Sequence, residues 1–427
     1  MKKNFNDYLK KYSFQKKIPK CDYIISCLKK LSQKYNENYT LLAICPNSIS
    51  VIRAAINSAK NYNVPLIFAA TLNQIDIDGG YTKLNFENFT SFVNNEILLK
   101  KYNGVTIIGI DHGGPWLKDK QSTERWSLEK SMNWIKKSFE SAVKAGYDLI
   151  HIDPTVDIFK GEIKIEVVVD RTVELIKHIE KFINDNDLYP VSYEVGTEEV
   201  HGGLANIEMF SNFLSILKTE LKRNNLEKVW PCFVVGKVGT DLHTTFFDFK
   251  IANLIVKEAA KYHSLIKGHY TDYVANPSDY PLSGIGGANI GPELTEIEFD
   301  SLMKLYKKEK ELFNAKKIKK ESDIVKILEK AVVDSGRWKK WLNENEKGVS
   351  FDKLTQDRKK WLVQTGARYV WTNPNVENAR EDLKRNLHKN NIDSEKIIQQ
   401  DISEIIYKYY KAFNLIGLNS KLEKVFF

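Results

Sequence analysis

The sequence predicts an α/β protein built as a (β/α)8 TIM barrel with a C-terminal helical extension. Three observations predict this fold: eight short apolar runs, longer amphipathic segments between them, and a change of composition near residue 312. The apolar runs lack polar alternation and are too short for helices, which is typical of parallel strands buried on both faces. Eight such strands alternating with helices favour a barrel, for which roughly 250 residues is typical.

The expected elements follow one another in a regular order. The eight strands are expected at 41–45, 65–70, 105–110, 148–152, 190–193, 231–235, 264–266 and 287–290. Amphipathic helices are expected at 49–63, 128–145, 167–184, 207–224 and 245–262. We therefore assign residues 1–315 to the catalytic barrel domain with a short N-terminal helical segment.

Residues 316–427 differ in texture, since they are rich in Lys and Glu and short of glycine. Their helical spacing predicts an extension packed on the barrel. We expect its tryptophans in the core rather than on a binding surface; they are Trp338, Trp341, Trp361 and Trp371. The basic runs 316–320 and 339–340 are interpreted as solvated helix faces.

Composition narrows the class of protein. The 427 residues are 42% hydrophobic, and no apolar stretch approaches the ~20 residues that span a bilayer. The four cysteines are scattered without C-x-x-C spacing, and the start lacks the apolar core of a signal peptide, so we expect a cytoplasmic protein. A net charge of +9 needs no nucleic acid or membrane partner to explain it, and mildly favours anionic substrates such as sugar phosphates.

An acid and a histidine stand together at the end of the third expected strand. Asp111 and His112 follow the run 105–110 and precede Gly113 and Gly114. Ligands of α/β barrels bind at the carboxyl ends of the strands. Imidazole is a good zinc ligand, and an adjacent carboxylate can move protons. The alternative for an isolated pair is structural, with the acid capping a turn and the histidine bonded to backbone.

Later strand ends supply partners for this pair. His243 follows the run 231–235, His269 follows 264–266, and Glu194 ends the run 190–193. Three histidines and an acid from separate strand ends are how a catalytic metal site with an open position is built. The sequence therefore predicts one divalent ion per chain, Zn²⁺, held by His112, His243 and His269.

The other histidines receive different interpretations. His178, His263 and His388 lie in lysine-rich helical surroundings and are expected at the surface. His151 lies inside a strand-like run, which favours a buried, hydrogen-bonded core residue over a ligand. His201 lies in a glycine loop and stays undecided.

Several motifs, in order along the chain, resemble one family. They are ATLNQ at 70–74, GGYT at 79–82, NFENF at 85–89, the segments that begin at Asp111, Glu194 and Gly268, and the aromatic segments 337–341 and 368–371. Together they resemble the tagatose-bisphosphate aldolase non-catalytic-subunit family, which is related to class II aldolases. The resemblance covers nearly the whole chain.

The resemblance implies roles for individual residues. It implies metal ligation by His112, His243 and His269, general acid/base catalysis by Asp111, and a second carboxylate near the metal at Glu194. It implies substrate contacts from a set of polar residues at the strand ends, namely Asn47, Ser48, Asn73, Asp272 and Asn289.

Two departures from class II aldolases matter. Those enzymes usually follow the last metal histidine with a glycine loop that binds phosphate through backbone N–H groups. Here His269 is followed by residues 270–273, which include Asp272, so we expect Gly284, Gly286 and Gly287 to supply the replacement. Many members of the non-catalytic group lack a counterpart of His243, and its presence here favours a catalyst over an assembly subunit.

Three functions are compatible with these residues. The first is a zinc-dependent aldolase acting on a ketose phosphate of the tagatose or fructose type. The second is a ketose 4-epimerase using the same metal site, and the third is a non-catalytic subunit that stabilises a separate aldolase. We expect a homo-oligomer, with a second aldolase subunit as a further partner. The loop 198–203 is the expected lid over the sugar.

Overall fold

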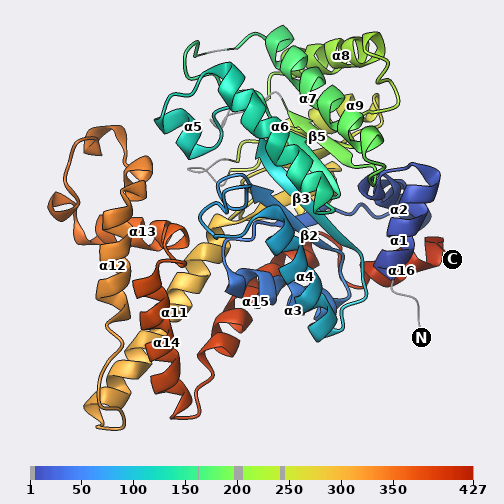
Figure 1. Ribbon diagram of the computed structural model, residues 1–427. Coiled ribbons are helices and arrows are strands. Elements are labelled where there is room, and N and C mark those ends of the chain that lie inside the picture. The colour runs from blue at the N-terminus through green and yellow to red at the C-terminus, as the bar shows by residue number, and fades with distance from the viewer. Residues whose placement is uncertain (1–4, 162, 197–204, 241–245, 427) are drawn as a thin grey trace.

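The computed structural model describes residues 5–161, 163–196, 205–240 and 246–426. Its centre is a closed barrel of eight parallel strands in the order β1 to β8, with helices around it (Figure 1). The expected TIM barrel with additional C-terminal helices is therefore confirmed. His201, His243 and the expected lid 198–203 lie outside the described residues.

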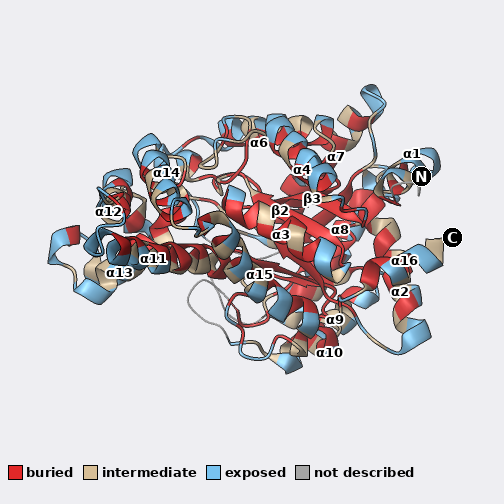
Figure 2. Ribbon diagram, turned by 90° about the horizontal axis from the view of Figure 1, so that it is seen from below, coloured by how far each residue is buried: buried red, intermediate tan, exposed pale blue. Residues whose placement is uncertain are grey.

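All eight strands lie close to the runs expected from the sequence. They are β1 (Leu41–Ile44), β2 (Leu66–Thr71), β3 (Thr106–Gly113), β4 (Leu149–Ile152), β5 (Ser192–Gly196), β6 (Phe233–Val235), β7 (Leu265–Gly268) and β8 (Gly287–Ile290). Nearly every strand residue is buried, because side chains fill the barrel on one face and helices cover the other (Figure 2).

The helices that follow the strands form the outer ring. They are α3 (Ile49–Tyr62), α4 (Phe86–Lys100), α5 (Asp119–Thr123), α6 (Leu128–Lys144), α7 (Ile165–Asp185), α8 (Ile207–Arg223), α9 (Phe249–Ala260), α10 (Asp279–Ser283) and α11 (Pro292–Asn314). Several begin at a residue whose side-chain oxygen accepts a hydrogen bond from a backbone N–H in the first turn, as Ser48, Ser127 and Asp248 do.

Two N-terminal helices, α1 (Phe5–Lys16) and α2 (Lys20–Tyr35), lie beside the barrel (Figure 1). The buried Lys20 ammonium reaches the start of β3, where it donates to the carbonyl of Thr106 at 2.5 Å and pairs with Asp148 at 2.7 Å. Thr106 begins β3, and Asp148 directly precedes β4. Helix α2 is therefore anchored at the end of the barrel opposite to the carboxyl ends of the strands.

The remaining chain is helical. Its elements are α12 (Ile324–Ser335), η1 (Arg337–Trp341), η2 (Glu344–Glu346), η3 (Phe351–Lys353), α13 (Gln356–Gly366), η4 (Ala367–Tyr369), α14 (Pro374–His388), α15 (Ser394–Ala412) and α16 (Leu418–Phe426). Helices α12, α13 and α14 form a lobe to one side of the barrel, whereas α15 packs against α3 and α16 against α2 (Figure 1).

The aromatic residues of this extension are mainly core residues, as expected. Trp338, Trp341 and Trp371 are buried, and Trp361 is half-buried against the core. The 339–340 pair is exposed, as expected, but its position adds something the sequence did not indicate. It lies in the short 3-10 helix η1, beside the mouth of the barrel rather than on a remote surface. None of the helices described is long and apolar enough to cross a membrane.

Candidate active site

A cavity of about 1520 Å³ opens at the carboxyl ends of the strands. Its wall includes many of the residues singled out in the sequence: Asn47, Asn73, Asp111, His112, His269, Asp272 and Asn289. Residues of η1 and η4 form another part of the wall. The cavity is therefore built jointly by the barrel and the extension.

A bulge in β3 brings Asp111 and His112 to the same place. Neighbouring strand residues normally point to opposite faces. Here β3 pairs with β4 through Ile110 opposite Ile150 and then Gly113 opposite Ile152, so β3 holds one extra residue. His112 takes up the irregularity with a left-handed φ of 48°. A bulge of this kind re-aims a side chain.

The loop after the bulge requires glycine for close packing. A Cβ at Gly114 would lie 1.8 Å from the carbonyl oxygen of Asp153. The end of β3 thus approaches the end of β4 as closely as backbone can, and this contact brings Asp153 to the His112 ring.

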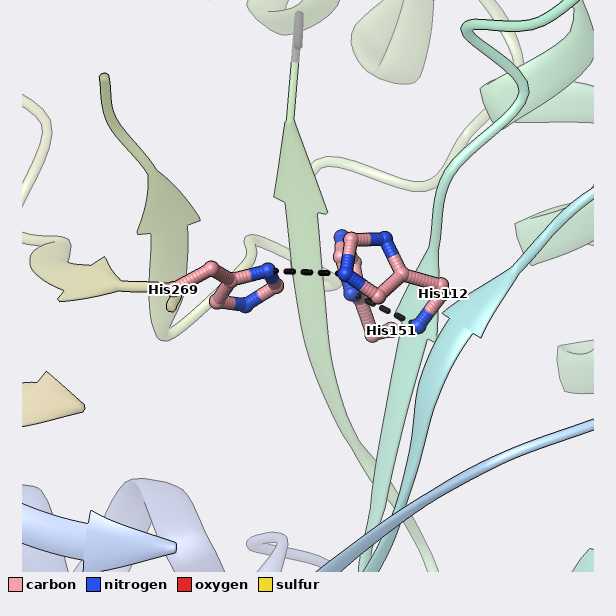
Figure 3. Close-up of side chains that lie close together, drawn as sticks. All are labelled: His112, His151 and His269. Carbon is pink, nitrogen blue, oxygen red and sulfur yellow. Dashed lines mark hydrogen bonds between the residues drawn. The ribbon is translucent and has the colours of Figure 1, made fainter. Parts of the chain in front are cut away.

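Three histidines meet at the strand ends. The rings of His112, His151 and His269 come from β3, β4 and the residue after β7, and they face one another in Figure 3. Nε2 of His112 and Nδ1 of His269 are 3.1 Å apart. All three rings offer a nitrogen within 4.8 Å of the others.

Each of two histidines is held by a carboxylate on its far nitrogen. Nδ1 of His112 lies 2.7 Å from Asp153, which also accepts a hydrogen bond from Thr155 at 2.5 Å. Nε2 of His269 lies 2.9 Å from Glu194. A carboxylate in this position fixes the ring orientation and tautomer of a metal-binding histidine. Both near nitrogens therefore face the same space.

Glu194 is a fully buried member of a second group. Its other oxygen pairs with the Lys267 ammonium at 2.6 Å. Lys267 and His269 are two residues apart and meet the same carboxylate, so Glu194 joins β5 to β7 across the barrel. Glu194 lies beneath the cavity surface rather than on it.

His151 lies beside these residues and is buried, as the sequence predicted. Its Nδ1 accepts the backbone N–H of His112 at 3.0 Å (Figure 3). The same nitrogen lies 3.3 Å from Asp111. Within the described part of the chain its Nε2 is buried and has no hydrogen-bond partner. Because Nδ1 accepts, the proton of the neutral ring is on Nε2, and this buried N–H lacks an acceptor among the described residues.

The electrostatics of the group is dominated by burial and charge pairing. Burial raises the pKa of Asp111, but the neighbouring His112 and His269 outweigh it and hold this pKa well below the usual range. For Glu194, burial is likewise outweighed by Lys267 and His151, which lower the pKa to about 2. Both carboxylates are therefore ionised at neutral pH.

The two facing histidines differ in charge. Burial lowers the pKa of His112, but Asp111 and Asp153 outweigh it and raise the pKa to about 9. For His269 burial prevails and lowers the pKa to about 4. A charged His112 thus donates through Nε2 to a neutral His269, which donates in turn to Glu194.

The residues present fit a divalent metal ion. Two Zn–N bonds of tetrahedral geometry separate the nitrogens by about 3.3 Å, close to the 3.1 Å between His112 and His269. Imidazoles backed by carboxylates are the donor set that zinc prefers. Two groups could hold an ion: His112 with His151 and His269, and Asp111 with His151, Glu194 and His269. The expected third ligand, His243, lies outside the described residues, and His151 is an additional candidate.

The expected substrate contacts fall into two kinds. Asn47 and Asn73 line the cavity but already have partners: Asn47 bonds Gly291, Gln74 and Tyr81, and Asn73 bonds the 117–119 loop. By contrast, both polar atoms of the Asn289 side chain are buried without a partner among the described residues. Asn289 is therefore the residue best prepared to receive a ligand hydroxyl.

Asp272 also lines the cavity, and its environment is unusual. Its Oδ1 accepts the backbone N–H groups of Gly291 and Glu293, both at 2.9 Å. Burial raises the pKa of Asp272 to about 7, although these hydrogen bonds oppose the rise. Near neutral pH this carboxyl is thus close to half-protonated, which lessens its repulsion of an anion.

Two expectations do not match the structure. Ser48 does not line the cavity; it caps α3 and donates to Glu298 at 2.5 Å, so its hydroxyl is used inside the fold. The glycines at 284, 286 and 287 precede or begin β8, at the end of the barrel opposite to the cavity. Gly286 packs on Leu265 instead. They cannot form a phosphate loop for this site.

Sequence reasoning missed His151 as a member of the group, and also missed Asp153, Lys267 and Arg368. A signal was present for the first two, because residues 151 and 153 stand at a strand end two apart and so share a face. Lys267 has the same relation to His269. Arg368 is far away in sequence, and only the folded extension brings it to the cavity.

A closed parallel barrel with a cavity at the carboxyl ends of its strands is the architecture of TIM-barrel proteins. The chain belongs to the family described as D-tagatose-1,6-bisphosphate aldolase subunit GatZ/KbaZ-like, whose model matches residues 28–416. The resemblance seen in the sequence is thereby confirmed.

Solved structures share the fold. A probable tagatose 6 phosphate kinase from Sinorhizobium meliloti 1021 is 17% identical, with a TM-score of 0.70 over 87% of this chain and 100% of that chain. A fructose-bisphosphate aldolase from Campylobacter jejuni is 11% identical, with a TM-score of 0.54 over 93% of this chain and 95% of that chain.

Proposed function

We propose that this protein is a metal-dependent aldolase that cleaves or forms a C–C bond of a ketose phosphate of the tagatose or fructose type. The observation that carries the proposal is the meeting of Asp111 with His112 and His269 on the wall of one cavity. Aldol chemistry needs a base for the substrate hydroxyl and a Lewis acid for the carbonyl. An ionised carboxylate can serve as the base, and imidazoles spaced to hold a metal ion can position the Lewis acid. The aldolase-subunit family is consistent with this assignment.

The residues divide the work as follows. Zinc, when bound by His112, His269 and a third ligand, would supply Lewis-acid polarisation of the ketose carbonyl. Asp111 accepts the proton of the substrate hydroxyl as the C–C bond breaks, and its lowered pKa keeps the carboxyl ionised at neutral pH. Glu194 holds the His269 ring rather than moving a proton, because both its oxygens are occupied.

A Schiff-base mechanism through Lys267 is not supported. A lysine nucleophile must lose its proton, which requires a lowered pKa. Burial does lower the pKa of Lys267, but Glu194 and Asp111 outweigh it, and the net shift is upward. The ammonium is charged and bonded to Glu194, so it acts as a structural cation.

Substitution of Asp111 tests the proposal. Asp111→Asn should retain zinc and lose activity by roughly 10²-fold or more, as expected for removing a general acid/base. His112→Ala should lose both zinc and activity. Metal content is measured by elemental analysis, and turnover with ketose mono- and bisphosphates by NMR. Near-normal turnover of Asp111→Asn would contradict the assignment.

A second candidate is a ketose 4-epimerase with the same residues. The observation that favours it is the cavity wall, to which η1 and η4 of the extension contribute. Such a wall would retain the aldehyde fragment while it rotated to present its other face, after which the C–C bond would form again. A coupled triose-phosphate assay separates the two: an aldolase releases triose continuously, whereas an epimerase yields only a rearranged ketose.

The third function, stabilisation of a separate aldolase subunit, is the outcome to examine if neither reaction occurs with zinc present. The family description names a subunit, which supports a partner of this kind. The measurement is the activity and thermal stability of a separate tagatose-bisphosphate aldolase with and without this chain.

A further inference from the structure

The extension contributes only positive charge to the cavity wall. Its charged wall residues, within the described chain, are Arg337, Lys339, Lys340 and Arg368. The extension as a whole contains many acidic residues. The excess of positive charge is therefore particular to the segments of the extension that line the cavity. A wall of one sign attracts ligands of the opposite sign.

Two of these cations already have a role. Arg337 and Lys340 both pair with Asp119 at the start of α5, the latter at 3.1 Å. Their charges are used in fastening η1 to the barrel. Lys339 is exposed to solvent, with its ammonium 5.9 Å from the centre of the Trp338 ring.

Arg368 differs from these three residues. Its side chain is buried, with 8% of the residue exposed, and its Nε has no hydrogen-bond partner among the residues described. Within the same residues it forms no ion pair: Asp272 acts on its charge only from beyond 4 Å. The guanidinium instead hydrogen-bonds to the Tyr369 side chain and stacks against Trp341, 4.9 Å from the ring centre.

A comparison within the extension shows how unusual this is. Arg358 also stacks against a tryptophan, Trp361, at 4.6 Å, but it pairs with Glu346 at 2.8 Å. Burying a guanidinium without a carboxylate is costly. The stacked ring fixes the plane of the Arg368 fork, and the cavity is the side from which an anion can reach it.

We propose that Arg368 binds the phosphoryl group of the substrate, an inference that rests on the proposed ketose-phosphate function. The guanidinium fork matches two phosphate oxygens and donates charge-assisted hydrogen bonds to them. Among the described residues, the glycines at 284–287 do not supply a phosphate-binding loop here, since they lie at the opposite end of the barrel. The extension thereby determines specificity for phosphorylated over free ketoses.

Calorimetry with three probes tests the assignment: inorganic phosphate, fructose 6-phosphate and fructose. Wild-type protein should bind fructose 6-phosphate more tightly than fructose. Arg368→Gln should weaken binding of phosphate and fructose 6-phosphate by about 10- to 100-fold, as expected for losing charged hydrogen bonds, and leave fructose unchanged. Arg380→Gln is the matched control, because Arg380 also stacks against a tryptophan, Trp371, at 4.7 Å but does not line the cavity, and it should bind all three probes as the wild type does.

Three outcomes would contradict the proposal. Equal binding of fructose and fructose 6-phosphate by the wild type, or unchanged binding by Arg368→Gln, overturns it, and equal weakening of fructose assigns Arg368 a structural role instead. If Arg368→Gln does not fold, Arg368→Lys replaces it and should show a partial loss confined to the phosphorylated probes. Failure of the aldolase proposal is seen separately, as intact phosphate-dependent binding without turnover.

Discussion

At the residue scale, His112 depends on two carboxylates with different tasks. Asp111 interacts electrostatically with both His112 and His269. Asp153 lies 2.7 Å from Nδ1 of His112, and Nε2 of the same ring faces His269. The bulge sets the backbone of His112 at a left-handed φ, and side-chain contacts set the direction of its ring. Asp153 is the carboxylate among these contacts.

Asp153→Asn should therefore lower zinc affinity by about 10- to 100-fold, the usual cost of losing a carboxylate behind a metal-binding histidine. The measurement is competition with a chromophoric chelator. Asp157→Asn is the matched control, because Asp157 is buried nearby but pairs with Arg171, at 2.9 Å, rather than with a histidine. Equal affinities in Asp153→Asn and wild type would show that His112 is not a ligand.

Zinc affinity should also depend on pH. The raised pKa of His112, about 9, means that a proton occupies the ring at neutral pH and must leave before a metal binds. Affinity should therefore rise roughly tenfold per pH unit between pH 7 and 8.5 and level off above about 9. His269, with a pKa near 4, adds nothing in this range.

The same chelator competition, repeated across pH, measures this slope. In Asp153→Asn one cause of the raised pKa is removed, so the plateau should begin at lower pH. A wild-type affinity that stays flat from pH 7 to 8.5 would contradict a charged His112 in the metal-free protein.

At the scale of the element, the start of α3 illustrates how a motif residue can serve the fold alone. Ser48 accepts the backbone N–H of Val51 and donates to Glu298 of α11. Glu298 also pairs with Arg380 of α14 at 3.0 Å. The Ser48 hydroxyl thus joins two barrel helices, and Glu298 links them to α14 of the extension.

Ser48→Ala should lower the free energy of unfolding by about 1–2 kcal/mol, since it removes a helix cap and leaves a buried carboxylate oxygen without a donor. Ligand affinity should not change. The control is Ser127→Ala, which removes the cap of α6 without a second partner and should cost less. Urea denaturation and calorimetry provide the two measurements. A loss of ligand affinity in Ser48→Ala would restore the substrate-contact interpretation.

The sequence predicted elements better than it predicted contacts. Apolar runs and helix caps are local signals, so all eight strands and the five expected helices were found within a few residues. Strand ends converge in any closed parallel barrel, so Asp111, Glu194 and His269 could be placed together. Which residues face the cavity depends on register, and the bulge after Ile110 has no signal in the sequence.

At the scale of the whole molecule, the extension was the hardest part to anticipate. Its lysine and glutamate content resembles that of any exposed helix, and the sequence therefore indicated a solvated surface for residues 339–340. Folding instead places η1 and η4 on the cavity wall. Long-range placement of this kind follows from packing of η1 on α12 and α13 and of η4 on α11, α12 and α13, which no local pattern encodes.

The last helix has a distant effect on the strand that carries the acid and the histidine. Asn419 of α16 is buried, and its side-chain oxygen accepts the backbone N–H of Val105 at 3.1 Å, just before β3 begins. This amide proton has no strand partner of its own, so its exchange with deuterated solvent reports whether α16 is docked. A ligand that tightened the barrel through the extension would slow exchange at this single amide, at the far end of the strand from where the ligand binds.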